Sequence, residues 1–347
     1  MKNIIHIILL IGGIAVTNLS IGQDPNFSQF FSSPLNINPA LTGHINNDWR
    51  VIANFRDQWV GPASPYVTGT ISYDRKIFQN KTLFTEDEEG NYGGIGGMLM
   101  YDQAMAGIVK STYASLNGSY SIQLAAGQVS HRLAAGFGAI YGRRSVDFSK
   151  LSFEDQFTGY GFDANMPSGE EALSSMKPYI SVTAGLLYNI STENSNFDIG
   201  FAGFHLNQPK QTFLADKNQT LAMRKVIHAN YETYLKVNIV LNTNAIYQWQ
   251  DEATYYSFGG ALGYILPDEK TTIVNAGLWY WSKNAFTPYL GLVYGNLQFG
   301  ASYDFTISTL RDTRRKPNTW EFSIILRGDK SHGPNSRAKG AVPCPWK

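Results

Sequence analysis

The chain of 347 residues has little charge, a single cysteine and, after residue 22, no apolar run long enough for a membrane-spanning helix. Charged residues make up 16% of the sequence, whereas about a quarter is typical of soluble domains. One cysteine excludes an internal disulfide. The 28 basic and 27 acidic residues leave a net charge of +1, so the charge balance gives no reason to expect a nucleic-acid partner.

The sequence also lacks the motifs of common catalytic and metal sites. The histidines at positions 44, 131, 205 and 228 are scattered, and none belongs to an HExxH or Cys-His pattern. The glycine runs Gly94-Ile-Gly96-Gly97 and Gly136-Phe-Gly138 lack the third glycine of a dinucleotide-binding loop and are not followed by a helical pattern. No nucleophile motif lies beside His131. We therefore expect a chain that is not an enzyme and has no metal or cofactor.

The first 22 residues have the pattern of a secretory signal peptide. Lys2 provides the basic start, an apolar run extends from Ile7 to Val16, and the small residues Ser20 and Gly22 precede a predicted mature N-terminus at Gln23. A membrane anchor is the alternative, but the run is shorter than the ~20 apolar residues that a spanning helix needs. We expect cleavage after residue 22.

What the chain has in abundance is aromatic residues, glycine and alternation of polar and apolar side chains. Aromatics make up 14% of the residues, and there are 33 glycines. Between Leu297 and Ser308, apolar residues at odd positions alternate with polar or small residues at even positions, and Tyr66 to Asp74 shows the same pattern. Such strands have one face for lipid and one for water, and their lengths suit the ~9–11 residues of a membrane-spanning strand. A soluble sandwich or propeller is the alternative, but no short repeat supports a propeller.

Continued along the chain, this pattern predicts an all-β fold, a transmembrane outer-membrane antiparallel β-barrel of about 14 strands. The candidate strands are 49–57, 66–76, 91–103, 109–122, 130–144, 177–191, 196–208, 225–237, 239–250, 253–266, 271–283, 285–295, 297–308 and 318–328. The sheet is expected to close, because an open edge in hydrocarbon leaves backbone groups unpaired. An even strand number predicts that both termini are periplasmic, with the long segments 145–176 and 209–224 on the outer side and a charged connection, 77–90, on the periplasmic side.

Residues 23–47 precede the barrel, which is expected to span 48–328, and residues 329–347 form a predicted periplasmic tail. The N-terminal segment is rich in proline and aromatic residues and has no strand or helix period. Two interpretations remain open: a plug that packs inside or beneath the barrel, or a docking peptide for a periplasmic partner. The candidate residues for either role are Asp24, Pro25, Phe27, Ser28, Gln29, Phe30, Pro34, Asn38 and Pro39.

The same segment resembles the opening of mature proteins of the PorP/SprF family, outer-membrane barrels of the type IX secretion system of Bacteroidota. The resemblance is carried by Gln23-Asp-Pro25, Phe27-Ser-Gln-Phe30, Pro34-Leu35, Asn38-Pro-Ala40 and Gly43. The strand Trp49-Arg-Val-Ile-Ala-Asn-Phe-Arg-Asp-Gln-Trp59, the closing Tyr303-Asp-Phe segment and the tail Val342-Pro-Cys-Pro-Trp-Lys347 are also similar. The resemblance implies that the chain binds periplasmic secretion components and supports the export or surface attachment of cargo proteins such as gliding adhesins.

The strand pattern therefore predicts a barrel in the outer membrane, in contact with outer-membrane lipid. The resemblance implies that this barrel acts by binding and positioning protein partners. A porin or substrate-selective channel, lined by inward residues such as Gln298, Ser302, Asp304 and Thr306, remains the alternative. Cys344 is either a thiol that bonds to a partner or a residue with no partner.

Overall fold

A computed structural model describes residues 24–61, 64–78, 90–158, 161–163, 165–166, 177–211, 220–267, 272–314 and 316–328. The predicted signal peptide 1–22, the tail 329–347 with Cys344 and most of the charged connection 77–90 lie outside the described residues. No helix among the described residues is long and apolar enough to cross a membrane.

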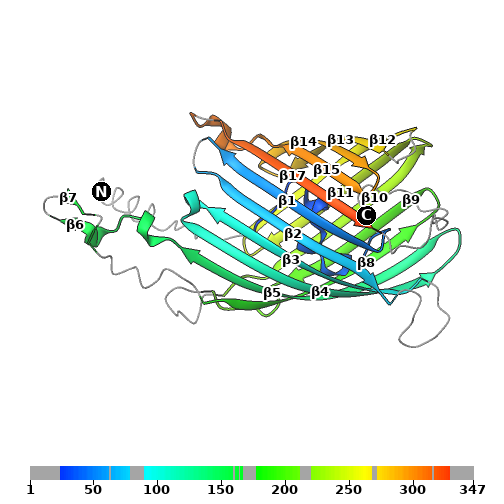
Figure 1. The fold of residues 1–347 in the computed structure, drawn as a ribbon, viewed down its shortest axis with the longest axis horizontal. Coiled ribbons are helices and arrows are strands. Elements are labelled where there is room, and N and C mark those ends of the chain that lie inside the picture. Colours follow the sequence, from blue (N-terminus) through cyan, green and yellow to red (C-terminus); the bar gives the residue numbers. More distant parts are fainter. Residues whose placement is uncertain are drawn as a thin grey trace, which may run out of the picture.

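Within the described residues, the chain forms one closed antiparallel ring of strands (Figure 1). Each strand pairs with its sequence neighbour, and β1 pairs with β17 to close the ring. The strands are β1 (Trp49–Val60), β2 (Tyr66–Ile77), β3 (Tyr92–Ala104), β4 (Val109–Ala125), β5 (Ser130–Val146), β8 (Tyr179–Ser191), β9 (Ser195–Phe204), β10 (Arg224–Lys236), β11 (Ile239–Gln250), β12 (Ala253–Leu266), β13 (Thr272–Trp281), β14 (Ala285–Tyr294), β15 (Leu297–Tyr303), β16 (Phe305–Thr306) and β17 (Asn318–Gly328). Because β15 and β16 are two parts of one strand interrupted at Asp304, these fifteen segments make a fourteen-stranded barrel, which confirms the predicted fold class.

The two faces of the barrel differ in chemistry. Large apolar side chains such as Leu116, Phe137 and Leu290 point outward and are 75%, 67% and 66% exposed. Polar side chains at the alternate positions point inward and are buried, including Asn117, Ser181 and Gln298. A continuous exposed apolar surface of this kind is stable only when lipid covers it. The alternation in the sequence therefore corresponds to a lipid face and a luminal face.

The two ends of the barrel carry connections of different length. At one end, here called the short-turn rim, β1 begins, β17 ends, and the turns 192–194, 237–238 and 295–296 join neighbouring strands. At the other end, the long-loop rim, residues 147–178 and 205–223 form the longest connections. The first of these contains the short turns η5 (Phe148–Lys150) and η6 (Glu154–Gln156) and a hairpin of β6 (Phe157–Thr158) and β7 (Gly161–Phe162), which projects away from the barrel (Figure 1). Two further turns, η4 (Met105–Gly107) and η8 (Thr309–Asp312), lie in other connections of this rim.

All fourteen candidate strands exist, and one of them is interrupted. The strand expected over 297–308 is broken at Asp304, whose carboxylate accepts hydrogen bonds from Ser28 and Thr287 inside the barrel. Trp281, at the end of β13, points into the lumen, where the guanidinium of Arg56 lies 4.5 Å from its ring centroid. Tyr101 and Tyr141 face outward, the orientation in which aromatic side chains lie at a membrane interface.

Candidate functional site: the occupied lumen

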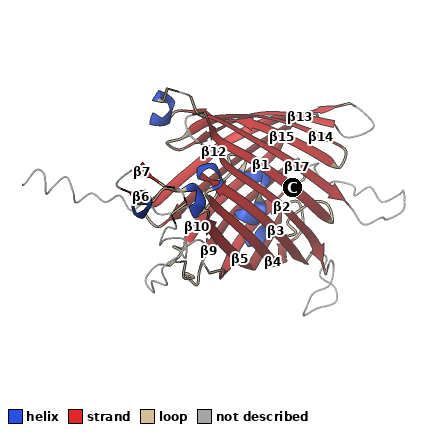
Figure 2. Cartoon of the chain, turned by 60° about the vertical axis from the view of Figure 1, so that its left-hand side comes forward, coloured by secondary structure: helices blue, strands red, loops and turns tan. Residues whose placement is uncertain are grey.

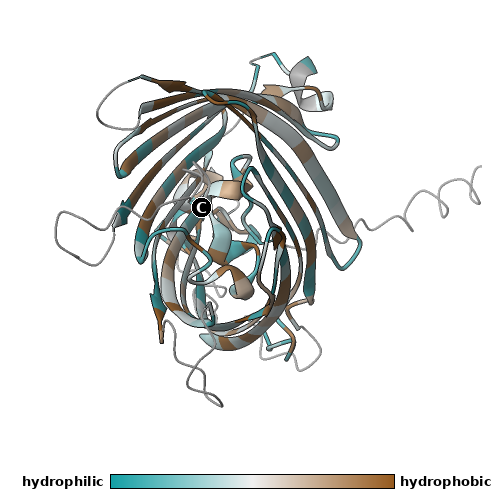
Figure 3. Cartoon of the chain, turned by 90° about the vertical axis from the view of Figure 1, so that its right-hand side faces the viewer, coloured by the Kyte–Doolittle hydropathy of each residue, from teal (hydrophilic) through white to brown (hydrophobic). Residues whose placement is uncertain are grey.

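The described part of the N-terminal segment, residues 24–47, lies inside the barrel. Figures 2 and 3 show its short helical turns within the ring of strands. The turns are η1 (Phe30–Ser32), η2 (Pro34–Asn36) and η3 (Pro39–Leu41), each of the 3-10 type. Pro34 and Pro39 begin the second and third turns, where a missing backbone N–H costs nothing. The sequence showed no regular period here because each turn is only three residues long.

The segment runs along the lumen from the long-loop rim to the short-turn rim. At the long-loop rim, the carboxylate of Asp24 lies 2.8 Å from His205 Nε2 and 3.2 Å from Arg224 Nε, and its backbone N–H donates to Gln250. At the short-turn rim, the Gly43 N–H donates to Asp74 over 2.7 Å. Strands β1 and β17 do begin and end at the same rim, as an even strand number predicts. Asp24 nevertheless lies at the rim opposite Gly328, because the chain ahead of β1 doubles back through the barrel.

Charge holds the long-loop end of the segment. Burial by itself raises the pKa of the Asp24 carboxyl, but the charges of His205 and Arg224 and the hydrogen bonds from His205 and Gln250 outweigh it and hold that pKa well below its usual range. Asp24 is therefore a carboxylate at neutral pH, paired with a guanidinium whose side chain is 2% exposed. Breaking a buried pair of this kind leaves an uncompensated charge.

Apolar contacts fix the middle of the segment. Phe31 packs on Trp279 and Tyr289, with ring centroids 4.7 Å and 5.6 Å apart. Phe30 belongs to the same cluster, whereas Phe27 and Leu35 pack against Met98, Met100, Tyr113 and Tyr179 on the other side of the lumen. Phe27 and Phe30 are 3% and 5% exposed. Neither aromatic side chain offers a surface to a partner outside the barrel.

Two glycines, from the glycine runs that do not form a dinucleotide-binding loop, allow the segment to approach the wall closely. A side chain at Gly136 would collide with the backbone of Pro39 and Ala40, and one at Gly94 would collide with the carbonyl of Thr42. The wall also donates a hydrogen bond to the segment here, since the Ser119 hydroxyl donates to the Thr42 carbonyl over 2.6 Å. These glycines serve contact between backbone and wall rather than phosphate binding.

Asn38 links the segment to the wall opposite the β1–β17 pair. Its side-chain amide donates to the carbonyls of Leu186 and Phe201 and lies 3.0 Å from His228 Nε2. Its carbonyl oxygen accepts from the Ala40 N–H and so caps η3. A single side chain thus joins the segment to β8, β9 and β10.

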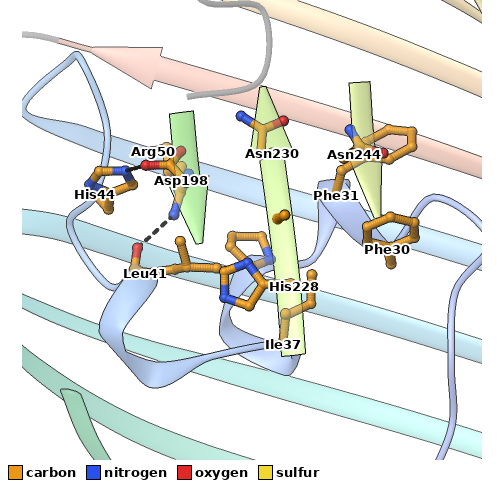
Figure 4. A pocket seen from close by; sticks show the side chains of 12 residues that line it. Phe30, Phe31, Ile37, Leu41, His44, Arg50, Asp198, His228, Asn230 and Asn244 are labelled. Carbon is orange, nitrogen blue, oxygen red and sulfur yellow. Dashed lines mark hydrogen bonds and ion pairs between the residues drawn. The ribbon is translucent and has the colours of Figure 1, made fainter. Parts of the chain in front are cut away.

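A small cavity remains between the segment and the wall near the short-turn rim (Figure 4). Its volume is about 70 Å³, enough for a few water molecules and too small for a metabolite. His44, Asp198 and His228 line it, and His44 Nε2 lies 3.0 Å from Asp198 Oδ1. The structure thus brings together two histidines that looked scattered in the sequence. Among the described residues, no group of three His, Cys, Asp or Glu side chains is placed to hold a metal ion.

The predicted candidate residues therefore all belong to the segment that occupies the lumen. Asp24 and Pro25 lie at the long-loop rim, and the remaining seven lie within the lumen between the aromatic clusters and the wall. Sequence reasoning missed the charged wall residues that bind the N-terminal segment, which are Arg50, Arg56, Asp74, His205, Arg224 and Glu321. The sign of these residues in the sequence was their charge at inward-facing positions, in strands that otherwise alternate apolar with neutral polar residues.

The fold and the site define a class of protein: an outer-membrane β-barrel whose lumen holds its own N-terminal segment. Among solved structures, the chain is similar to a deletion mutant of the monoaromatic hydrocarbon channel TodX, at 8% identity and a TM-score of 0.50, over 84% of this chain and 93% of that one. A Pseudomonas aeruginosa FadL homologue matches at 11% identity and a TM-score of 0.43, over 84% and 92%. At these identities the likeness concerns the barrel fold alone.

The sequence profile of one family, described as type IX secretion system membrane protein PorP/SprF, matches residues 19–326. The match spans nearly the whole chain, and the chain belongs to the PorP/SprF family. No curated protein matches its sequence. Family and fold together make the chain an outer-membrane component of a type IX secretion system, as the resemblance of the N-terminal segment implied.

Proposed function

We propose that this chain is a non-enzymatic scaffold of the secretion machine, which binds periplasmic components and supports the export or surface attachment of cargo proteins such as gliding adhesins. The observation that carries this proposal is the occupied lumen. A pore for solutes needs a free path, whereas a protein that positions partners tolerates a plugged barrel. Residues 24–45 are bound to opposite walls of the lumen through Gln29 and Asn38 and to both rims through Asp24 and Gly43.

In this proposal, the short-turn rim faces the periplasm and the long-loop rim faces the exterior. Bacterial barrels have short periplasmic turns and longer outer loops, and the connections of this chain differ in that way. The periplasmic face then consists of the short turns together with the connection 77–90 and the tail 329–347. Cys344 in that tail is a candidate for a bond to a partner.

The plug interpretation of residues 23–47 is favoured over the docking interpretation. Phe27 and Phe30 are buried against the wall, so they can reach a partner only if the segment leaves the lumen. Three of the four inward residues that the channel interpretation names are also engaged. Ser302 and Asp304 bind the segment, and Gln298 accepts a hydrogen bond from Arg327.

Affinity isolation tests the proposal directly. The tagged protein is isolated from gently solubilised outer membranes of its native host, and the bound proteins are identified by mass spectrometry. Recovery of periplasmic type IX components or of a large surface adhesin supports the scaffold and names its cargo. Recovery of the barrel alone, under conditions that preserve other outer-membrane complexes, contradicts it.

Conductance in planar bilayers tests the plugged lumen separately. We expect the full chain to conduct poorly and a variant without residues 23–43 to conduct several-fold better. Equal conductance of the two proteins, both shown to migrate as folded barrels, would argue against the plug.

A further inference from the structure

The seam where the barrel closes is irregular at its long-loop end. Strands β1 and β17 pair residue by residue from Trp49 opposite Gly328 to Asp57 opposite Trp320, and the register then shifts before Val60. Trp59 lies in this shift with φ of 64°, a conformation that a tryptophan rarely adopts. Its backbone N–H donates to the Thr319 hydroxyl over 3.1 Å. The backbone ladder alone thus holds this end of the seam less well than a regular strand pair.

Two residues of the luminal segment lie across this part of the seam. The backbone N–H groups of Ser28 and Gln29 donate to the two carboxylate oxygens of Glu321 over 2.8 Å and 2.7 Å. The Ser28 hydroxyl donates to Asp304 and accepts from Arg56, each over 2.8 Å. Ser28 therefore contacts the first strand, the last strand and the break between β15 and β16.

The Gln29 side chain completes the contact. Its amide nitrogen donates to the Ser302 hydroxyl and to the Glu321 carbonyl, both over 2.9 Å, and its oxygen accepts from the Ser323 hydroxyl over 2.8 Å. Gln29 is 1% exposed. Donor and acceptor groups of this amide are matched by polar groups of the wall, which is the behaviour of a ligand in a specific binding site.

Buried charged groups of the wall lie beside this contact. Arg56 Nη1 lies 3.0 Å from Glu321 and its Nη2 lies 3.0 Å from Asp304, and all three side chains are at most 3% exposed. One guanidinium thus faces two carboxylates. The N–H groups of Ser28 and Gln29 supply further hydrogen bonds to the two carboxyl oxygens of Glu321, which would be costly to bury without partners.

We infer that the luminal wall of β1, β15 and β17 is a peptide-binding site whose ligand is the Ser28-Gln29 dipeptide of this chain, and that its occupancy holds the closure seam together. This role is separate from obstruction of the lumen, because a plug could rest on any part of the wall. The contact through Asn38, on β8, β9 and β10, touches no residue of the seam. The inference stands independently of the partners proposed above.

Hydrogen exchange of the full-length protein in detergent, followed by mass spectrometry, tests this inference. In Gln29→Ala we expect amides of 50–57 and 318–326 to exchange roughly tenfold to a hundredfold faster, because three side-chain hydrogen bonds are lost. The matched control is Asn38→Ala, whose faster exchange should appear in 185–203 instead. If Gln29→Ala does not fold, Ser323→Ala replaces it in the experiment. This variant removes one of the three Gln29 side-chain hydrogen bonds from the wall side, so its effect in the same two strands should be smaller.

A reversible cross-link provides the second measurement. Phe55 and Phe322 are paired across the seam and point to the lipid side, so Phe55→Cys with Phe322→Cys, in a Cys344→Ser background, can join the strands without touching the lumen. With the disulfide formed, Gln29→Ala should no longer accelerate exchange at the seam, and reduction should restore the effect. Acceleration spread evenly over all strands, or an unchanged seam in Gln29→Ala while Asn38→Ala responds, would overturn the inference.

Discussion

Arg56 on the first strand and Glu321 on the last strand face each other in register and form a buried ion pair of 3.0 Å where the barrel closes. The two residues are 265 positions apart in the sequence. Asp304 binds the same guanidinium over 3.0 Å. The pair and its second carboxylate lie at the centre of the contacts between the luminal segment and the wall, and they give the most direct test of what holds the barrel together.

We predict that Arg56→Met destabilises the folded barrel by about 3–5 kcal/mol, since it leaves two buried carboxylates without a cation. The measurement is urea unfolding in lipid vesicles. The folded fraction is read from the difference in gel mobility between heated and unheated protein. The matched control is Lys150→Ala, which removes an exposed pair with Asp147 of 3.7 Å and should cost less than about 1 kcal/mol. Equal midpoints for the two variants would contradict a structural role for Arg56.

We predict that Gly136→Val releases the luminal segment and raises conductance several-fold. A side chain at this position collides with the backbone of Pro39 and Ala40, whereas valine itself suits a strand. The control is Gly118→Val on the neighbouring strand, where an added Cβ meets its nearest atom at 3.8 Å, an ordinary contact. Single-channel recording separates the two variants, and the same low conductance in both would show that the segment tolerates the substitution.

We predict that acid loosens the long-loop end of the segment through Asp24. The pKa of this carboxyl is depressed in the folded protein, so its contribution to stability is present above the unfolded value of about 3.9 and is lost as pH falls toward the folded value. Pepsin cleavage near Phe27, detected by intact mass and normalised to an unstructured peptide, should therefore increase between about pH 4 and pH 2. Asp24→Asn should be cleaved equally at both pH values. A wild-type protein that resists cleavage throughout would argue against this anchor.

We predict that Phe27→Ala with Phe30→Ala leaves partner association intact while increasing conductance. Both rings fill space between the segment and the wall, so their loss loosens the plug rather than a docking surface. The check is affinity isolation in parallel with bilayer recording, with the lipid-facing Phe137→Ala as control. Loss of the partners from the double variant alone would restore the docking interpretation.

Most of the fold could be predicted because each strand of a barrel meets two different environments. Alternation such as that from Leu297 to Tyr303 follows directly from lipid on one side and polar groups on the other. The break at Asp304 was not predicted, and the carboxylate of Asp304 binds Ser28, which lies 276 positions away. Local pattern carries no information about a partner that distant.

The site could be predicted only in part. The composition of residues 23–47 identified them as the special segment, and the aromatic residues and prolines indicated that they lie against a surface. Their path from one rim to the other was not predictable, because 3-10 turns of three residues have no period to detect. The wall residues that bind them come from strands across the whole chain, and only the closed ring brings Arg56, Arg224 and Glu321 around one lumen.

The reversal of the chain ahead of β1 determines which side of the membrane a label would report. A label inserted after Gly328 starts at the short-turn rim, where the last strand ends, whereas a label joined directly ahead of Asp24 starts at the opposite mouth of the barrel. Antibodies or a membrane-impermeant dye applied to intact cells would thus reach one label and not the other. These two attachment points, at the ends of the described part of the chain, would therefore report opposite sides of the membrane.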